Sequence, residues 1–78
     1  MWVKMMLLSK AKIGQTSEIL KIDGPDKKRK FLTSLGCCEG ERITLVSMLA
    51  GNYVVNIKDS RYALDEKMAR YIELADIH

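Results

Sequence analysis

Residues 42–58, RITLVSMLAGNYVVNIK, decide the fold class of this chain. Two groups of apolar residues in this stretch recur at every second position, which is the side-chain period of a β-strand. They are Ile43 and Leu45 in the first group, and Tyr53, Val55 and Ile57 in the second. The segment Ala50-Gly51-Asn52 between the two groups is typical of a tight turn. The stretch therefore predicts a β-hairpin.

Apolar segments on both sides of the hairpin extend the predicted sheet. These are Val3 to Leu8, Glu18 to Ile22, Arg61 to Leu64 after a second turn at Asp59-Ser60, and Tyr71 to Ala75. So few strands cannot cover both faces of an open sheet, whereas a small barrel buries one face and removes most of the exposed edge. We therefore expect one mainly β domain over residues 1–78, an SH3-like barrel of about five strands with one or two short helices.

Two segments break the strand pattern and predict short helices. Pro25 to Leu35 begins with a proline, which the first turn of a helix tolerates, and Phe31 and Leu35 have i, i+4 spacing. Gly36 follows as a left-handed C-cap. A second helical turn is indicated by apolar residues at four-residue spacing, with Asp65 as a suitable N-cap. Those apolar residues are Leu64, Met68 and Ile72.

The two cysteines of the chain, Cys37 and Cys38, stand side by side in the segment LGCCEGE. A closed zinc site takes four ligands, and its strong signature is two separated C-x₂-C pairs, so one adjacent pair does not indicate such a site. Neighbouring Cα atoms lie about 3.8 Å apart, whereas disulfide-bonded cysteines usually span about 4.4–6.8 Å. We interpret the segment as architectural: Leu35 and Gly36 end the helix, and Gly40 completes a turn before the next strand.

Residues for catalysis are scarce in this chain. The single histidine, His78, is the last residue, where chains usually fray, and no serine or cysteine has a histidine neighbour in sequence that would activate it. The acidic pairs Asp65-Glu66 and Glu39 with Glu41 are explained by helix capping and turn solvation. We therefore assign no catalytic residues and expect a protein that is not an enzyme.

Positive charge is concentrated in one run, Lys27, Lys28, Arg29 and Lys30, on a chain of net charge +3. On a predicted helix these four side chains are candidates for binding an acidic partner. A small-barrel nucleic-acid-binding protein is the alternative, with Tyr53, Tyr62 and Trp2 as candidate stacking groups. The basic excess is smaller than that of dedicated nucleic-acid binders, so we do not expect nucleic acid as the partner.

The apolar segments do not predict membrane insertion or export. Met5-Met6-Leu7-Leu8, the longest apolar stretch near the N-terminus, is far shorter than the ~20 residues of a bilayer span. A small-residue cleavage site does not follow it. Two cysteines without a disulfide framework favour a reducing, cytoplasmic setting.

A series of motifs along the chain has the order and spacing of a known family. The motifs are RKFLTSLGCCEG at residues 29–40, ITLV at residues 43–46, and RYAL at residues 61–64 followed by Ala69 and Ile72. This series resembles the FeoA family, which comprises small SH3-like proteins of bacterial ferrous iron transport. The resemblance runs over nearly the whole chain, from Met6 to Leu74.

The resemblance implies a non-enzymatic cytoplasmic accessory that interacts with the cytoplasmic part of the FeoB-type ferrous iron transporter. It supplies no cofactor and no iron ligands. A weaker hypothesis is that ferrous iron, a transition metal ion, binds directly through Cys37, Cys38, Glu39 and Glu41. Whether copies of the chain form a homo-oligomer stays open.

Two positions depart from the family pattern. Cys37 stands where family members usually carry an aliphatic residue, so we expect Cys37 to be buried. Cys38 stands at a variable position and is expected to be more exposed. Asp59-Ser60 replaces a glycine that is often found at that turn, which leaves the shape of the turn open.

Overall fold

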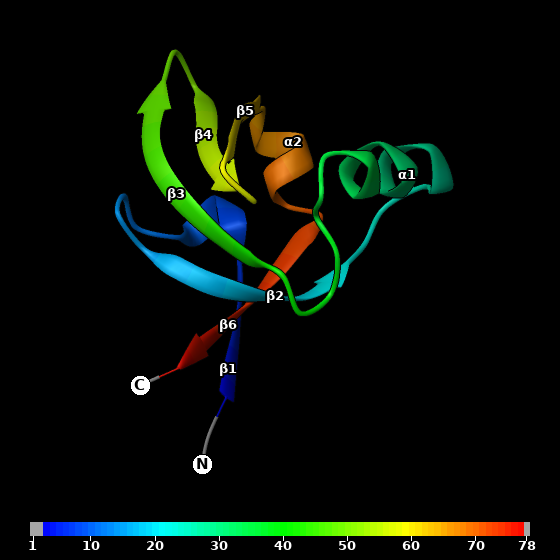
Figure 1. The fold of residues 1–78 in the computed structure, drawn as a ribbon, viewed down its shortest axis with the longest axis horizontal. Coiled ribbons are helices and arrows are strands. Elements are labelled where there is room, and N and C mark those ends of the chain that lie inside the picture. The colour runs from blue at the N-terminus through cyan, green and yellow to red at the C-terminus, as the bar shows by residue number, and fades with distance from the viewer. Residues whose placement is uncertain (1–2, 78) are drawn as a thin grey trace.

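Within residues 3–77, whose backbone the structure describes, six antiparallel strands form one curled sheet (Figure 1). The structure is a computed structural model, and its side chains are described for residues 5–75. The elements are β1 (Val3–Leu7), the 3-10 turn η1 (Leu8–Lys10), β2 (Thr16–Ile22), α1 (Asp26–Ser34), β3 (Arg42–Leu49), β4 (Asn52–Ile57), β5 (Ser60–Leu64), α2 (Glu66–Ala69) and β6 (Ile72–Ile77). The strand order is β1-β6-β2-β3-β4-β5.

The sheet curls toward a barrel, but its two edge strands, β1 and β5, do not pair with each other in the described chain. At this gap η1, which follows β1, packs against α2, which follows β5. The Tyr53 hydroxyl in β4 donates a hydrogen bond to the Ser9 carbonyl of η1 at 3.0 Å, which joins the two sides. The expected mainly β, small-barrel architecture is confirmed, with six strands rather than about five.

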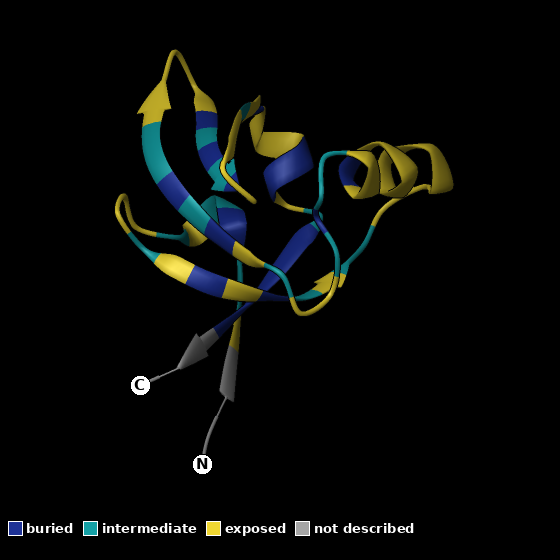
Figure 2. Cartoon of the chain, viewed as in Figure 1, coloured by how far each residue is buried: buried dark blue, intermediate teal, exposed yellow. Residues whose placement is uncertain are grey.

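The two-residue period of the hairpin places its apolar side chains in the core, as predicted. Ile43, Leu45, Val55 and Ile57 are at most 1% exposed, and Tyr53 is 7% exposed. Other elements complete this core with Leu8, Ile19, Leu32, Ile72 and Leu74 (Figure 2). Leu32 is the buried residue of α1, so one side chain anchors the helix to the sheet.

Both hairpin turns have two central residues with positive φ. Ala50 and Gly51, with φ of 51° and 80°, join β3 to β4. Lys58 and Asp59, with φ of 48° and 65°, join β4 to β5. Type I′ turns require positive φ at both positions, and their twist matches that of the flanking strands. The second turn lies one residue earlier than predicted, because Ser60 already pairs with Ile57 in the ladder.

Helix α1 ends in two backbone hydrogen bonds that close its last turn. The N–H of Gly36 donates to the Thr33 carbonyl, and the N–H of Cys37 donates to the Leu32 carbonyl, both at 3.0 Å. This is the Schellman arrangement, in which a left-handed residue ends the helix and the next residue packs against its last turn. Gly36 has φ of 102°, and Cys37 and Leu32 are both fully buried.

Helix α2 is a single turn that begins where the sequence indicates. The Asp65 carboxylate accepts a hydrogen bond from the Met68 N–H at 2.8 Å, which is the expected N-cap. The α2 turn places Met68 and Ala69 in the core. Neither of the two α-helices in the described residues is long and apolar enough to cross a bilayer.

Replacement of Gly36 by alanine should destabilise the fold more than the same change at Gly14. Both glycines have positive φ, 102° and 91°, where a Cβ costs about 1–2 kcal/mol. At Gly36 the new Cβ would also lie 3.3 Å from Cγ2 of the buried Ile57, whereas at Gly14 no described atom lies within 4 Å. Urea unfolding followed by circular dichroism measures both losses. Equal losses in the two variants would show that close packing at Gly36 does not matter.

Candidate functional site

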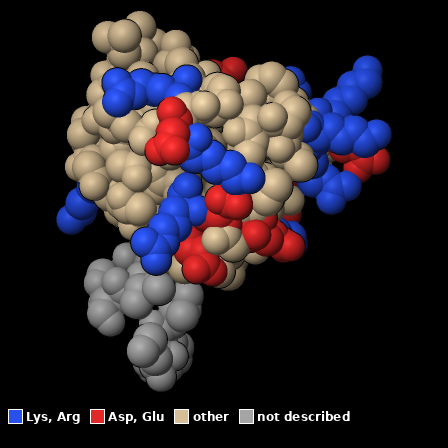
Figure 3. Space-filling view, viewed as in Figure 1, with Lys and Arg blue, Asp and Glu red and all other residues tan. Residues whose placement is uncertain are grey.

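The basic run lies on α1, and the helix divides it between two grooves. Lys27 and Lys28 line a groove of about 460 Å³ that faces α2 and β5. Arg29 and Lys30 line a wider groove of about 820 Å³ that faces β2. The division arises because successive residues of an α-helix are about 100° apart around its axis. Figure 3 shows Lys and Arg gathered over α1 at one end of the molecule.

Three of these four cations form no ion pair with the described part of the chain. Arg29 pairs with the Asp26 carboxylate one turn earlier on α1. Lys27, Lys28 and Lys30 do not take part in any ion pair among the described residues. They lie in the first half of α1, near the positive end of the helix dipole, which is an unfavourable place for a cation. The helix therefore presents uncompensated positive charge to solvent.

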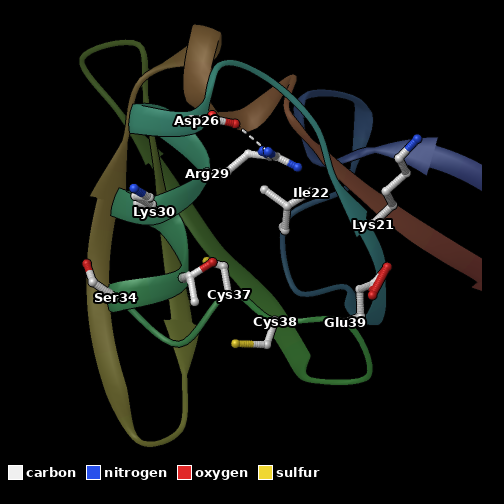
Figure 4. Close-up of a pocket in the computed structure, with 10 residues that line it drawn as sticks. Lys21, Ile22, Asp26, Arg29, Lys30, Ser34, Cys37, Cys38 and Glu39 are labelled. Atoms are coloured by element: carbon white, nitrogen blue, oxygen red, sulfur yellow. Dashed lines mark hydrogen bonds and ion pairs between the residues drawn. The ribbon is translucent and has the colours of Figure 1, made fainter.

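The wider groove lies between α1 and the end of β2 (Figure 4). Its lining includes Lys30 and Ser34 on the helix side, Lys21 and Glu39 on the opposite side, and Cys37 and Cys38 from the turn after α1. Several of its polar groups already have partners in the chain. The Ser34 hydroxyl donates to the Phe31 carbonyl at 2.6 Å, and Lys21 Nζ lies 3.4 Å from Asp23 Oδ1.

The two cysteines differ in burial, as predicted. Cys37 is fully buried, whereas Cys38 is half-buried at the edge of the wider groove. Burial raises the pKa of the Cys37 thiol to about 12, and the neighbouring Cys38 contributes in the same direction. Because the thiolate is the reactive and metal-binding form of cysteine, Cys37 is inert at neutral pH. It serves as a small apolar residue under the end of α1.

The four weak metal candidates are not assembled into a ligand set. Cys37 points its thiol into the core, and Glu41 Oε1 lies 3.4 Å from Lys58 Nζ. Among the residues that the structure describes, no three side chains of His, Cys, Asp or Glu lie close enough to hold one metal ion. The remaining candidates, Cys38 and Glu39, line the wider groove. His78 lies outside the described residues.

Of the three candidates for base stacking, the two that the structure describes, Tyr53 and Tyr62, both pack into or against the core. Tyr53 is buried, and its hydroxyl is used in the bond to Ser9. Tyr62 is half-buried and packs against the core, and Trp2 lies outside the described residues. The exposed aromatic side chain in the described chain is Phe31, at 50%. Sequence reasoning used Phe31 only as a mark of helical spacing, yet the structure buries its neighbour Leu32 and leaves Phe31 beside Lys27 and Lys28.

Sequence reasoning also missed a pair of carboxyl groups next to the start of α1. Asp23 follows β2, and Glu73 lies in the neighbouring strand β6. A hydrogen bond from Glu73 lowers the pKa of Asp23, and the nearby Lys21 ammonium acts in the same direction. The pKa of Glu73 is raised by this hydrogen bond, by burial and by the charge of Asp23. No local motif could have revealed the pair, because β-sheet pairing alone brings these distant residues together.

Comparison with known protein families gives a match to the FeoA domain over residues 6–76. This chain belongs to the FeoA family. Members of the family are associated with ferrous iron transport. Comparison with curated proteins gives no match.

Solved structures of FeoA proteins share the fold of this chain. FeoA from Chlorobium tepidum has 20% identity and a TM-score of 0.85, with 94% of this chain and 71% of that chain covered. FeoA from Stenotrophomonas maltophilia, complexed with zinc and described as a prokaryotic SH3-domain protein, has 21% identity and a TM-score of 0.79, with 91% and 89% covered. A manganese-dependent transcriptional repressor has 18% identity and a TM-score of 0.87, with 99% of this chain and 44% of that chain covered. The expected SH3-like fold is thereby confirmed.

Alkylation should distinguish the two cysteines in the folded protein. With iodoacetamide at mildly alkaline pH, Cys38 should react first, because its thiol is accessible. Cys37 should react at least ~100-fold more slowly, because it must wait for local opening of the structure. Mass spectrometry of peptides from a time course measures both rates, and concentrated guanidinium chloride should make them similar. Preferential labelling of Cys37 in the folded protein would contradict the burial described here.

The replacement Glu73→Gln should change how stability depends on pH. Folding raises the pKa of Glu73, so its protonated form stabilises the fold in acid, and this contribution is lost as the pH rises through the folded pKa. Glutamine can still donate to Asp23 but never ionises. Thermal unfolding between about pH 4 and pH 8 should therefore show a gain in Tm for the variant that grows with pH. Glu18→Gln, at an exposed position of β2, is the control. A gain that does not grow with pH would contradict this assignment.

Proposed function

We propose that this protein is a cytoplasmic, non-enzymatic accessory of ferrous iron transport that docks on the cytoplasmic part of an FeoB-type transporter. The observation that carries the proposal is the uncompensated basic face of α1 on a domain of the FeoA family. The Stenotrophomonas relative, described as a candidate activating factor of bacterial ferrous iron transport, supports the same pathway. Docking by complementary charge is the chemistry that this face supports.

The geometry of α1 suits a docking element. A single buried side chain, Leu32, anchors the helix, so nearly all of its other side chains are exposed. The hydrogen bonds at Gly36 and Cys37 hold the end of the helix in one orientation. A helix that is fixed in place binds without paying the entropy of ordering a loop. Long-range attraction by its lysines would speed encounter with an acidic surface.

An accessory role is also supported by the side chains around the grooves. Cys37 is a buried, protonated thiol, and Ser34 uses its hydroxyl on the Phe31 carbonyl. The lysines of α1 without an ion pair among the described residues are Lys27, Lys28 and Lys30. Such groups attract and orient an anionic surface, and they do not activate a nucleophile in the way that a paired base does.

Charge reversal on α1 tests the proposal against a matched control. The double variant Lys27→Glu/Lys30→Glu should bind the purified cytoplasmic part of the transporter at least about tenfold more weakly than the wild type at low salt. Lys10→Glu/Lys12→Glu changes the net charge equally at exposed positions before β2 and should stay within about twofold of the wild type. Isothermal titration calorimetry measures both affinities.

Salt and genetics provide the other readouts. Raising the ionic strength to about 1 M should reduce the difference between the α1 variant and the wild type, because salt screens exposed charges. Deletion of the protein should lower ferrous iron uptake by the cells. The proposal is rejected if the wild-type protein does not bind the transporter, or if iron uptake is unchanged by the deletion.

A further inference from the structure

We infer that the groove between α1 and the α2–β5 corner is the docking site for an acidic segment of the partner that carries one large apolar side chain. The groove is lined by Lys27, Lys28, Phe31, Ala63, Leu64, Asp65 and Met68. The inference rests on the proposed function, and within it assigns the surface that recognises the partner. It also separates the two halves of the basic run: the first half contacts the partner, and the second only attracts it.

The floor and one wall of this groove are apolar. Leu64 and Met68, which are 2% and 8% exposed, form the floor, and the half-exposed ring of Phe31 stands beside them. Figure 2 shows that α1 is exposed over most of its length. A volume of about 460 Å³ is in the usual range for sites that enclose a small ligand. Such a space fits one large side chain with its immediate neighbours, so a chain segment is the matching occupant.

Two cations and one carboxylate lie on the rim of the groove, so its net charge is positive. Lys27 and Lys28 precede Phe31 by four and three residues, so helical geometry puts their side chains next to its ring. Neither lysine has an ion-pair partner among the described residues. The carboxylate on the rim, Asp65, already accepts the hydrogen bond from the Met68 N–H and caps α2. Two unpaired ammonium groups over an apolar floor select carboxylates that flank an apolar anchor.

The wider groove on the other side of α1 offers a weaker match. Both grooves are lined by charges of both signs, here Lys21, Arg29 and Lys30 with Asp26 and Glu39, so the difference lies in how many cations are already paired. Arg29 is paired with Asp26, and Lys21 with Asp23. Only Lys30 among its three cations lacks an ion pair within the described chain. Charge complementarity therefore favours the α2 side of the helix.

A second copy of this chain does not suit the groove. A two-fold symmetric contact with its axis at the groove would bring Lys27 and Lys28 of one copy close to the same residues of the other. The chain also carries a net charge of +3, which adds repulsion between copies. An acidic segment instead satisfies the lysines and covers the apolar floor at once.

Titration of the full-length protein with the purified cytoplasmic part of the transporter tests the assignment. Phe31→Ser and Lys27→Glu should each weaken binding by at least about tenfold. Lys30→Glu, on the same helix but in the other groove, should weaken it by less than about threefold through loss of long-range attraction. Lys12→Glu should leave the affinity unchanged. Unfolding cannot explain the losses, because Phe31 is half-exposed and an acidic residue in the first turn favours the helix.

The possible results distinguish failure of the groove assignment from failure of the proposed function. If the transporter binds the wild type, and binds Phe31→Ser and Lys27→Glu equally well, the groove assignment is overturned while the proposed function stands. If the transporter does not bind the wild type, the proposed function fails, and a synthetic peptide with one tryptophan among glutamates decides about the groove. The groove assignment is supported if the peptide shifts the NMR signals of Phe31, Ala63 and Met68 and if these shifts are lost when the tryptophan is replaced. The assignment is overturned if no such shifts are seen. The wild-type protein could also prove to be a dimer that the Phe31→Ser replacement converts to a monomer. That result would identify a second copy of the chain as the occupant and overturn the assignment of the groove to an acidic segment.

Discussion

The Schellman cap at the end of α1 is the interaction on which the rest of this molecule depends. It turns the chain within two residues, from an exposed helix into the core, and Cys37 is the side chain that follows the turn inward. Since Leu32 is the buried residue of the helix, the position of α1 is set by this cap and by one apolar contact. Both grooves have α1 as a wall, so their shapes also depend on the cap.

The parts of the fold that sequence could predict are those that depend on local patterns. The alternation around the β3–β4 turn, the Asp65 cap and the glycine after α1 each act within a few residues, and each is found where it was expected. The inward position of Cys37 followed from its place in the family pattern. The second turn was placed one residue late, because a glycine-free turn at Lys58 and Asp59 gives little signal of its register.

The candidate functional surface was less predictable, because it depends on which way side chains face in three dimensions. Four consecutive cations in the sequence suggest one patch, but the turn of α1 places two of them in the groove beside α2 and two in the wider groove beside β2. Whether Phe31 or Leu32 is buried depends on the rotation of α1 over the sheet, which apolar spacing alone does not determine. The pairing of Asp23 with Glu73 arises from the contact between β2 and β6, which no local motif specifies.

The pairing of β1 with β6 has a consequence for how this domain can be joined to other proteins. These strands, the first and the last, are antiparallel neighbours, with Val3 opposite Ile77, and they extend away from the body of the molecule on the side opposite to the β3–β4 hairpin (Figure 1). A polypeptide connected at either end would start on a side of the molecule away from α1 (Figure 1). The fold thus suits modular use, and the repressor of which this chain spans 44% is an example of the same fold within a longer chain. An attachment at that edge would begin at a distance from the proposed docking groove.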